Sequence, residues 1–229
     1  MSIVIKAPSG GGSISLDTQQ SVTGDHTLVL PAGVGTADQV LKNGSTPGTL
    51  EFAQPKVQPG QVIEKISSIC NGRSVTVGSG TYTITDVTGP QYPDTTYEDV
   101  NGSSFTYTPP SGTNTVEYEF IQYIGYAGTT APLGHFRFYL DSTEVTCMRS
   151  TSYMYYDGYH VMRIPLSLNN ATEDIANGKV GSWTSNKTMK LQARKYLSAY
   201  TMGLNRIYHW EGTASVQNVK PTISITSIA

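Results

Sequence analysis

The chain has 229 residues, a formal net charge of −2 and only 14% charged residues, compared with roughly 25% in typical soluble domains. Near-neutral charge without a basic run argues against nucleic acid as a partner, because binding to a phosphate backbone needs a positively charged surface. No stretch approaches the ~18 consecutive apolar residues of a membrane-spanning helix, and the first residues lack the apolar core of a signal peptide. We therefore expect neither membrane insertion nor secretion by the general pathway.

The first 56 residues are poor in bulky side chains. They contain short apolar pieces between glycine and serine, and Phe52 is the only one of the 22 aromatic residues that precedes position 82. A segment of this size buries too little surface to fold alone, and its low charge argues against the alternative of a disordered, solvated arm. We therefore expect an extended N-terminal β arm that is ordered by sister chains or by a receiving surface. Its expected contact residues are Ile3, Val4, Ile5, Ile14, Leu16, Leu28 and Leu30.

A connector with two prolines, residues 54–60, predicts a domain boundary, with an arm over residues 1–56 and a β-rich domain over residues 57–229. In the second domain short runs of alternating polarity recur between turn residues, as in a sandwich or barrel. One hairpin is predicted through residues 141–144, and another through Asp157-Gly158, a pair that tolerates the positive φ angles of a type I′ turn. The predicted strands lie at residues 74–77, 82–87, 104–108, 116–120, 136–140, 145–148 and 221–226.

Two stretches fit both helical and strand spacing. Apolar residues between Val62 and Cys70 recur at helical spacing, and we predict a short helix or an irregular segment near residues 61–70. Around residues 189–200 the helical spacing competes with strict alternation of apolar and basic or amide side chains. There we predict a half-buried strand.

The sequence shows no recognisable catalytic, cofactor-binding or metal site. None of its four histidines has a histidine or cysteine at metal-ligand spacing, and nucleotide-binding, hydrolase and zinc-protease motifs are absent. Adjacent acids such as Glu98 and Asp99 point to opposite faces of a strand, although a polysaccharide-cleaving pair of distant carboxylates stays open as an alternative. We predict that the protein is not an enzyme and needs no cofactor or metal.

Two smaller groups have a structural and a functional interpretation. Cys70 and Cys147 are too few for a disulfide framework, and we expect two reduced, packed thiols. The only basic cluster is interpreted as a solvated strand face, with contact to an anionic surface as the alternative. This cluster consists of Lys187, Lys190, Arg194 and Lys195.

Tyrosine is the informative excess, since all 15 tyrosines follow residue 81 and several surround the Asp157-Gly158 turn. A tyrosine ring offers a flat apolar surface with a hydroxyl group, which suits sugar stacking and protein interfaces. The alternative is that alternate rings fill the core, although one turn cannot bury so many rings on one face. The candidate residues for contact with a host surface or glycan are Tyr153, Tyr155, Tyr156, Tyr159 and His160.

Two parts of the sequence resemble proteins of bacteriophage appendages. The first is similar to a module of tail fibres and related appendages, especially of marine and cyanobacterial phages, through GGSISL (11–16), TLVLP (27–31), ADQVLK (37–42) and LEF (50–52). The second resembles the C-terminal β-domain of similar fibre proteins through GSSFTYTPP (102–110), TCMR (146–149), SWTS (182–185) and HWEGT (209–213).

This resemblance implies an all-β, homotrimeric virion appendage. Its C-terminal antiparallel jelly-roll sandwich, of the tumour-necrosis-factor or C1q type, would follow an N-terminal arm attached to the particle. Unlike long fibres, the chain has one copy of the N-terminal module and no heptad shaft, which favours a short tail fibre, a head fibre or a capsid decoration.

The expected partners are two sister chains and other virion structural proteins of the tail or capsid. The expected location is the virion, assembled in the cytoplasm of the host bacterium. The first alternative is an adhesin, a receptor-binding protein that recognises a host-surface carbohydrate. The second alternative is a polysaccharide depolymerase.

Overall fold

The computed structural model divides the chain into two compact units, residues 1–56 and residues 57–229, and the division falls within the proline-containing connector. None of the helices in the described part of the chain has the length and hydrophobicity needed to cross a bilayer. The structure describes the backbone of residues 3–6 and 13–16 and all atoms of residues 29–46, 48–125, 131–153, 157–208, 211 and 216–229.

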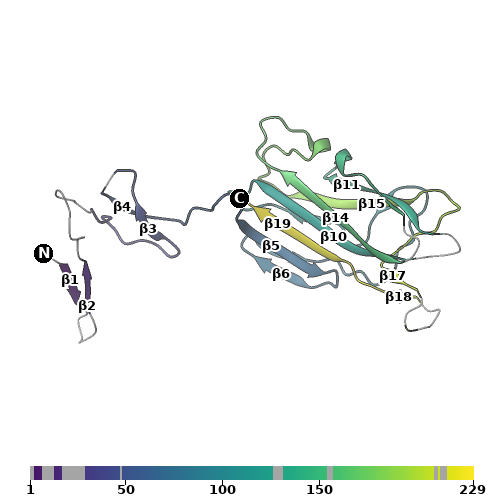
Figure 1. The fold of residues 1–229 in the computed structure, drawn as a ribbon, viewed down its shortest axis with the longest axis horizontal. Helices are drawn as coiled ribbons and strands as arrows, with labels where there is room; N and C mark the ends of the chain where they lie inside the picture. The colour runs from purple at the N-terminus through teal and green to yellow at the C-terminus, as the bar shows by residue number, and fades with distance from the viewer. Residues whose placement is uncertain are drawn as a thin grey trace. The chain divides into compact units, whose positions relative to one another are not determined.

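The first unit contains two small antiparallel sheets of two strands each (Figure 1). Strand β1 (Ile3–Lys6) pairs with β2 (Ser13–Leu16), and β3 (Val40–Asn43) pairs with β4 (Leu50–Ala53). The short runs of Val, Leu and Ile explain why strands form here, since branched side chains favour extended backbone.

No second layer covers the described side chains of this unit. None of the residues described between positions 29 and 56 is buried. Apolar side chains are among the exposed ones, with Leu30 66% and Val34 97% exposed. Strand pairing in this unit therefore occurs without a hydrophobic core in its described part.

The second unit is a sandwich of two antiparallel sheets (Figure 1). The first sheet has the strand order β14 (Gly158–Ser167), β10 (Thr115–Gly125), β19 (Thr222–Ile228) and β5 (Val62–Ile69), and β16 (Gly203–Leu204) also pairs with β10. The second sheet has the order β12 (Thr143–Glu144), β11 (Leu133–Leu140), β15 (Lys187–Lys195) and β8 (Glu98–Asp99), with β13 (Ser150–Tyr153) on β11 and β9 (Phe105–Tyr107) on β15. The remaining elements are the hairpin β6 (Ser74–Val77) and β7 (Gly80–Thr83), the pair β17 (Arg206–Ile207) and β18 (Gln217–Asn218), and the 3₁₀ helices η1 (Thr146–Met148) and η2 (Ile175–Asn177).

The order in which the chain visits the two sheets is that of a jelly roll. From β5 in the first sheet the chain crosses to β8 and β9 in the second, returns to β10, and crosses again to β11 and β13. It then alternates between the sheets through β14, β15 and β19. Repeated crossing between two packed antiparallel sheets characterises the jelly roll. The predicted all-β class with a jelly-roll sandwich is therefore confirmed.

Alternation of side chains along the long strands produces the core between the sheets. On β10 the residues Val116, Tyr118 and Phe120 are buried, whereas the glutamates between them face outward. The ring of Tyr118 packs against Phe138 of β11 with centroids 5.0 Å apart. The predicted strand around Met189 is confirmed as β15, whose inward residues belong to the same core.

The prediction of a helix or irregular segment near residues 61–70 is wrong, because this stretch is the strand β5, whose pairing with β19 shifts register once, between Val62 and Glu64. Two of its inward positions are polar, Glu64 and Ser68, and so the apolar residues alone do not show the period of two. The Glu64 carboxylate tolerates burial because it accepts hydrogen bonds from Ser79 and Tyr107. A pattern of apolar residues cannot reveal an inward position of this kind.

Both predicted hairpins differ from the structure. The chain does reverse at Asp141, which has a positive φ of 54°, but the returning strand is the short β12 and residues 146–148 form η1. The hairpin predicted at Asp157-Gly158 is wrong, because β13 pairs with β11 in the second sheet and β14 pairs with β10 in the first. Local turn residues cannot distinguish a turn within one sheet from a crossing between two sheets.

The two cysteines are both free and lie in different environments. Cys70 is buried, and burial raises the pKa of its thiol to about 12, so the thiol stays protonated. Cys147 is exposed on η1. The expectation of a packed thiol is confirmed for Cys70 and wrong for Cys147, because the strand expected there is replaced by a surface 3₁₀ turn.

Candidate functional site

The predicted tyrosine-rich contact region lies where β13 ends and β14 begins. Tyr153 is 62% exposed and Tyr159 is 65% exposed. Tyr155 and Tyr156 lie outside the described residues. Two tyrosines of this region therefore present most of their ring to solvent.

His160, the fifth candidate of this group, packs inward. Its ring stacks on Phe136 of the second sheet with centroids 4.3 Å apart. Burial lowers the pKa of His160 to about 4, so the imidazole is neutral at pH 7. Gln122, its partner across β10 and β14, lies with Nε2 3.5 Å from Nδ1 of the ring. This histidine contributes to the packing between the sheets.

The outer face of the first sheet carries a group of apolar side chains. The register places Ile121 opposite Val161 and Tyr123 opposite Tyr159. The two tyrosine rings meet edge to face with centroids 5.1 Å apart. Exposed Ile69 of the edge strand β5 lies at the same level of the sheet, separated from Ile121 by Thr222 of β19. We call these residues, Ile69, Ile121, Tyr123, Tyr159 and Val161, the outer patch.

The residues predicted for attachment of the arm lie in the first unit. Ile3, Val4 and Ile5 belong to β1, and Ile14 and Leu16 belong to β2, where Ile3 pairs with Leu16 and Ile5 with Ile14. Leu30 is exposed, and Leu28 lies outside the described residues.

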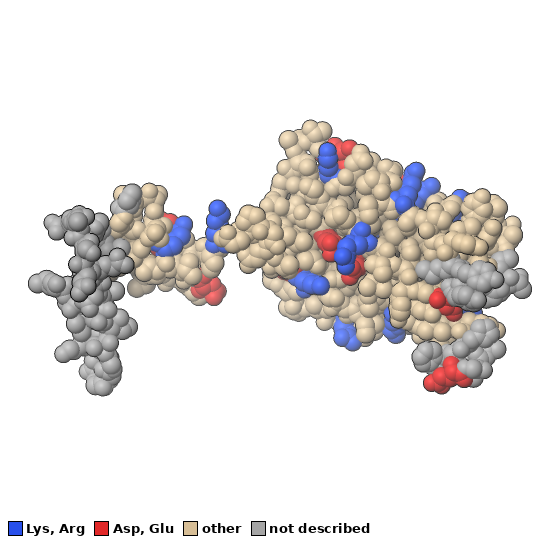
Figure 2. All heavy atoms as spheres, in the orientation of Figure 1, with Lys and Arg blue, Asp and Glu red and all other residues tan. Residues whose placement is uncertain are grey.

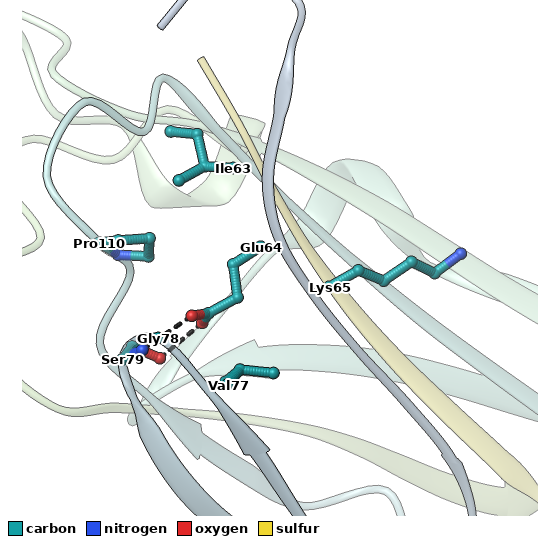
Figure 3. Close-up of a pocket in the computed structure, with 7 residues that line it drawn as sticks. All are labelled: Ile63, Glu64, Lys65, Val77, Gly78, Ser79 and Pro110. Carbon is teal, nitrogen blue, oxygen red and sulfur yellow. Dashed lines mark hydrogen bonds between the residues drawn. The ribbon is translucent and has the colours of Figure 1, made fainter. Parts of the chain in front are cut away.

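A pocket of about 670 Å³ opens beside β5 and the turn between β6 and β7 (Figure 3). Its only carboxylate, Glu64, points at this turn and accepts hydrogen bonds from the amide nitrogen of Ser79 at 2.8 Å and from its hydroxyl at 2.5 Å. The hydroxyl of Tyr107 donates to the same carboxylate at 2.9 Å and meets Ser227 Oγ at 2.7 Å. This network fastens the β6–β7 hairpin to the sandwich, and we assign Glu64 a structural role.

The pockets of the described residues can be tested for the paired acids of a glycosidase, which lie about 5–9.5 Å apart. Besides the Glu64 pocket there is a second beside Asp94, a third beside His135 and a fourth at the loop around Pro110. None of these four pockets contains more than one carboxylate, and that of Asp94 is paired with Lys195 at 3.0 Å. In the part of the chain that the structure describes, no cluster of three or more His, Cys, Asp or Glu is arranged to hold a metal ion.

A cluster of arginines and one tyrosine occupies the outer face of the second sheet. The guanidinium carbon of Arg137 lies 3.8 Å from the ring centroid of Tyr97, and that of Arg194 lies 5.3 Å from it. Glu144 accepts two hydrogen bonds from Arg149, at 2.6 and 3.1 Å, and lies 3.5 Å from Nε of Arg137. We call these five residues the arginine face.

Positively charged side chains outnumber carboxylates in the arginine face. Glu144 is the only carboxylate paired with these arginines among the described residues; it contacts Arg137 and Arg149, and the hydrogen bond from Arg149 lowers its pKa. His135 lies opposite Arg194, with Nδ1 3.3 Å from a guanidinium nitrogen. Burial, together with Arg194 and Arg137, lowers the pKa of His135. The arginine face therefore carries three guanidinium groups and one carboxylate, and the lowered pKa of His135 agrees with this excess of positive charge.

The predicted basic cluster on β15 divides into paired lysines and one arginine. Among the described residues, Arg194 has no carboxylate partner, which links it to the arginine face instead. The visible face of the molecule shows scattered charges of both signs rather than a broad basic surface (Figure 2). Each lysine has an aspartate partner: Lys187 pairs with Asp141 at 3.4 Å, Lys190 with Asp99 at 2.8 Å, and Lys195 with Asp94 at 3.0 Å. The paired lysines favour the interpretation as a solvated strand face.

Neither Glu64 nor the arginine face is marked by a local sequence motif. Glu64 and Tyr107 are 43 positions apart, and Tyr107 and Ser227 are 120 apart, so no local motif joins them. The one available signal was the alternation of His135, Arg137 and Tyr139, which places three functional side chains on the same face of a predicted strand.

No protein-family model matches this sequence, and no curated protein matches it either. Similar solved structures include a chain of infectious bursal disease virus strain Gx, with 8% identity and a TM-score of 0.32 over 83% of this chain and 42% of that chain. The crystal structure of the VP2 subviral particle of the same virus gives 8% identity and a TM-score of 0.32, over 84% and 47% of the two chains. The nora virus structure gives 12% identity and a TM-score of 0.22, over 94% and 89%. This chain spans less than half of the infectious bursal disease virus chains, and the jelly-roll assignment rests on its own strand order.

Proposed function

We propose that this protein is a non-enzymatic structural protein of a bacteriophage virion. In this proposal it is a short trimeric tail fibre, a head fibre or a capsid decoration that attaches to the particle through residues 1–56. The observation that carries the proposal is the absence of any buried residue among those described between positions 29 and 56, although apolar side chains recur there. The sequence resemblance to phage appendage modules supports the same role.

Open strand edges in the first unit support attachment through it. Each of its two described sheets has only two strands, and the second edge of β4 is met only at its first residue, where the Leu50 amide donates a hydrogen bond of 2.9 Å to the Val29 carbonyl oxygen; no strand covers the remaining outer edges among the described residues. Two-stranded sheets are marginally stable alone, and an unpaired edge can add a strand of another chain. Burial of exposed side chains such as Leu41 and Phe52 would then contribute about 25 cal/mol for each Å² of apolar surface removed from water.

The outer patch supports association of the second unit with its own copies. Contiguous exposed apolar groups on one sheet face mark interaction surfaces, and closed rotational symmetry is the usual arrangement of identical chains. Arg163 and Glu119 form an ion pair on the same outer face, next to Val161 in the register, which gives the patch a charged neighbour of the kind found at interface rims. We place the contact between three sister chains here.

Comparison of the full chain with residues 57–229 tests both parts of this proposal. Light scattering is expected to give trimers for both, because the second unit has its own core and the outer patch. Co-sedimentation with virions that lack the protein is expected for the full chain only, and equal co-sedimentation of the shorter chain would refute the role of residues 1–56. In the full chain, Leu41→Asp should weaken co-sedimentation while the neighbouring Lys42→Gln should not.

A substitution in the outer patch tests the trimer interface separately. Val161→Asp is expected to give monomers in light scattering, because a carboxylate would be buried without a partner. The matched control is Ser167→Asp, at an exposed position on the same strand. A trimer that survives Val161→Asp would place the interface elsewhere.

The exposed Tyr153 and Tyr159 favour a second candidate, an adhesin that binds a host-surface carbohydrate. Solvent-exposed tyrosine rings supply rigid stacking surface at low entropic cost. A glycan array probed with the full chain and with the Tyr153→Ala and Tyr159→Ala variants tests it. Binding that is lost in these variants supports the adhesin, whereas no binding by the full chain would leave the structural role alone.

A further inference from the structure

The arginine face continues into a row of exposed aromatic rings. On β11 the residues Leu133, His135 and Arg137 share the outer face. Leu133 pairs with Tyr153 on one side, and on the other its carbonyl oxygen accepts a hydrogen bond of 2.9 Å from the amide of Tyr196. Tyr153 and Tyr196 are both exposed. Two tyrosine rings therefore flank the end of β11 at which the arginine face begins.

A small pocket lies between the aromatic end and the arginines. It has a volume of about 180 Å³, and its polar lining residues include Tyr97, His135, Arg149 and Thr151. Its floor is Phe136, which belongs to the core. Hydroxyl groups, an imidazole and one exposed guanidinium therefore line the same pocket.

The arginines around this pocket carry more positive charge than the carboxylates beside them neutralise. The buried Nε atoms of Arg137 and Arg194 have no hydrogen-bond acceptor, although Nε of Arg137 lies 3.5 Å from Glu144. The neighbouring Lys190 is already paired with Asp99. Glu144 pairs with Arg149 and Arg137 and leaves Arg194 without a carboxylate among the described residues, so the three arginines keep a net positive charge that attracts an added anionic group.

The tyrosines and the arginines lie at successive levels along β11. Positions two apart on one face of a strand are separated by about 6.6 Å, so the level of Leu133, with its tyrosines, and the level of Arg137 lie about 13 Å apart. Aromatic rings stack on the apolar faces of sugars, and guanidinium groups recognise carboxylates. We propose that this surface binds an acidic oligosaccharide, with the carboxylate of a sugar acid in the Arg149 pocket and a neighbouring sugar ring on Tyr153 and Tyr196.

This proposal rests on the second candidate function, the carbohydrate-binding adhesin, and names its ligand class; it does not depend on the arm or on the trimer. The charged partner is a saccharide carboxylate, as in a uronic or sialic acid.

Titration calorimetry of the full chain at low salt tests the proposal with four probes. The acidic probes are a hyaluronan tetrasaccharide and sialyllactose, and the controls are chitotetraose, which is neutral, and inorganic sulfate. Saturable binding of at least one acidic probe, with no binding of chitotetraose and weaker binding of sulfate, is expected. Binding of neither acidic probe, equal binding of chitotetraose, or equally tight binding of sulfate would overturn the proposal.

A matched pair of arginine variants locates the site. Arg149→Gln removes an exposed arginine paired with Glu144, and Arg163→Gln removes an exposed arginine paired with Glu119 on the other sheet. The first is expected to weaken binding roughly 10-fold or more, as for loss of one charge-assisted hydrogen bond, and the second to leave it unchanged. Tyr196→Ala should also weaken binding of the acidic probe. Equal losses in the two arginine variants would mean non-specific attraction and would contradict the site.

Discussion

Strands β3 and β10 are both antiparallel and both carry recurring apolar side chains, yet they lie in different surroundings. All four residues of β3 are exposed, whereas every second residue of β10 from Val116 to Ile124 is buried against the opposite sheet. Residues 29–56 and residues 57–229 therefore differ in packing more than in local backbone structure. Strand pairing thus needs only a neighbouring edge, while a core needs a second layer.

The largest difference in unfolding free energy between the two units is expected when one aromatic ring is removed from each. Phe138→Ala should destabilise the second unit by about 3–5 kcal/mol, because it leaves a cavity in the core between the sheets. Phe52→Ala, on exposed β4, should change stability by less than about 0.5 kcal/mol. Urea unfolding followed by circular dichroism measures both. Similar losses for the two variants would contradict the absence of a core around Phe52.

The next contrast compares a buried and an exposed glutamate. Glu64→Ala leaves the Ser79 amide and the Tyr107 hydroxyl without their acceptor and should cost about 2–4 kcal/mol in unfolding free energy. Glu51→Ala removes the exposed ion pair with Lys42 and should cost at most about 1 kcal/mol. Thermal unfolding of both variants decides the comparison, and a small loss for Glu64→Ala would show that the β6–β7 turn holds without it.

The pH dependence of stability should arise in the second unit, through His160. Its pKa is about 4 when folded and returns to the ordinary value of 6.5 when unfolded, because burial disfavours the charged form. The unfolded state then binds more protons between pH 6.5 and 4, so this contribution is complete above pH 6.5 and is lost as the pH falls toward 4. The loss amounts to about 3 kcal/mol at most.

Urea unfolding at pH 7 and pH 4.5 measures this loss. His160→Phe, which cannot bind a proton, should remove most of the difference between the two pH values, and removal of residues 1–56 should leave the difference intact. A pH dependence that persists in full in His160→Phe would assign it to other groups.

The smallest expected effects belong to ion pairs at the surface of either unit, in which the side chain of Lys42 is 52% exposed and that of Lys190 is 26% exposed. Lys42→Gln in the first unit and Lys190→Gln in the second should each change the unfolding free energy by no more than about 0.5 kcal/mol. Raising the salt concentration should abolish even these differences, because exposed charges are screened. A loss above 1 kcal/mol for Lys42→Gln, on the order of a partly buried pair, would indicate that β3 is covered in solution.

Much of the fold was predictable, and the errors have identifiable physical causes. The strand through Val116 and the strand through Met189 were predicted because apolar and polar residues alternate there without interruption. The strand β5 was missed because Glu64 occupies an inward position. The crossing at Asp157-Gly158 was read as a hairpin because a turn pair carries no information about which sheet the next strand joins.

The candidate sites were less predictable than the strands. Exposure of Tyr153 and Tyr159 agrees with the tyrosine excess around the turn, but the inward packing of His160 on Phe136 depends on a contact between the two sheets. The arginine face joins Tyr97, which precedes β8, to arginines of β11 and β15. Such groups meet only after the sheets have formed.

The β-rich class and the shortage of bulky side chains in the first 56 residues follow from composition and local periodicity. Which strands share a sheet, which polar side chains are buried with partners and which charges lack a counterion become defined only in the folded molecule. Those properties depend on contacts between residues far apart in the chain, and local sequence carries little of that information.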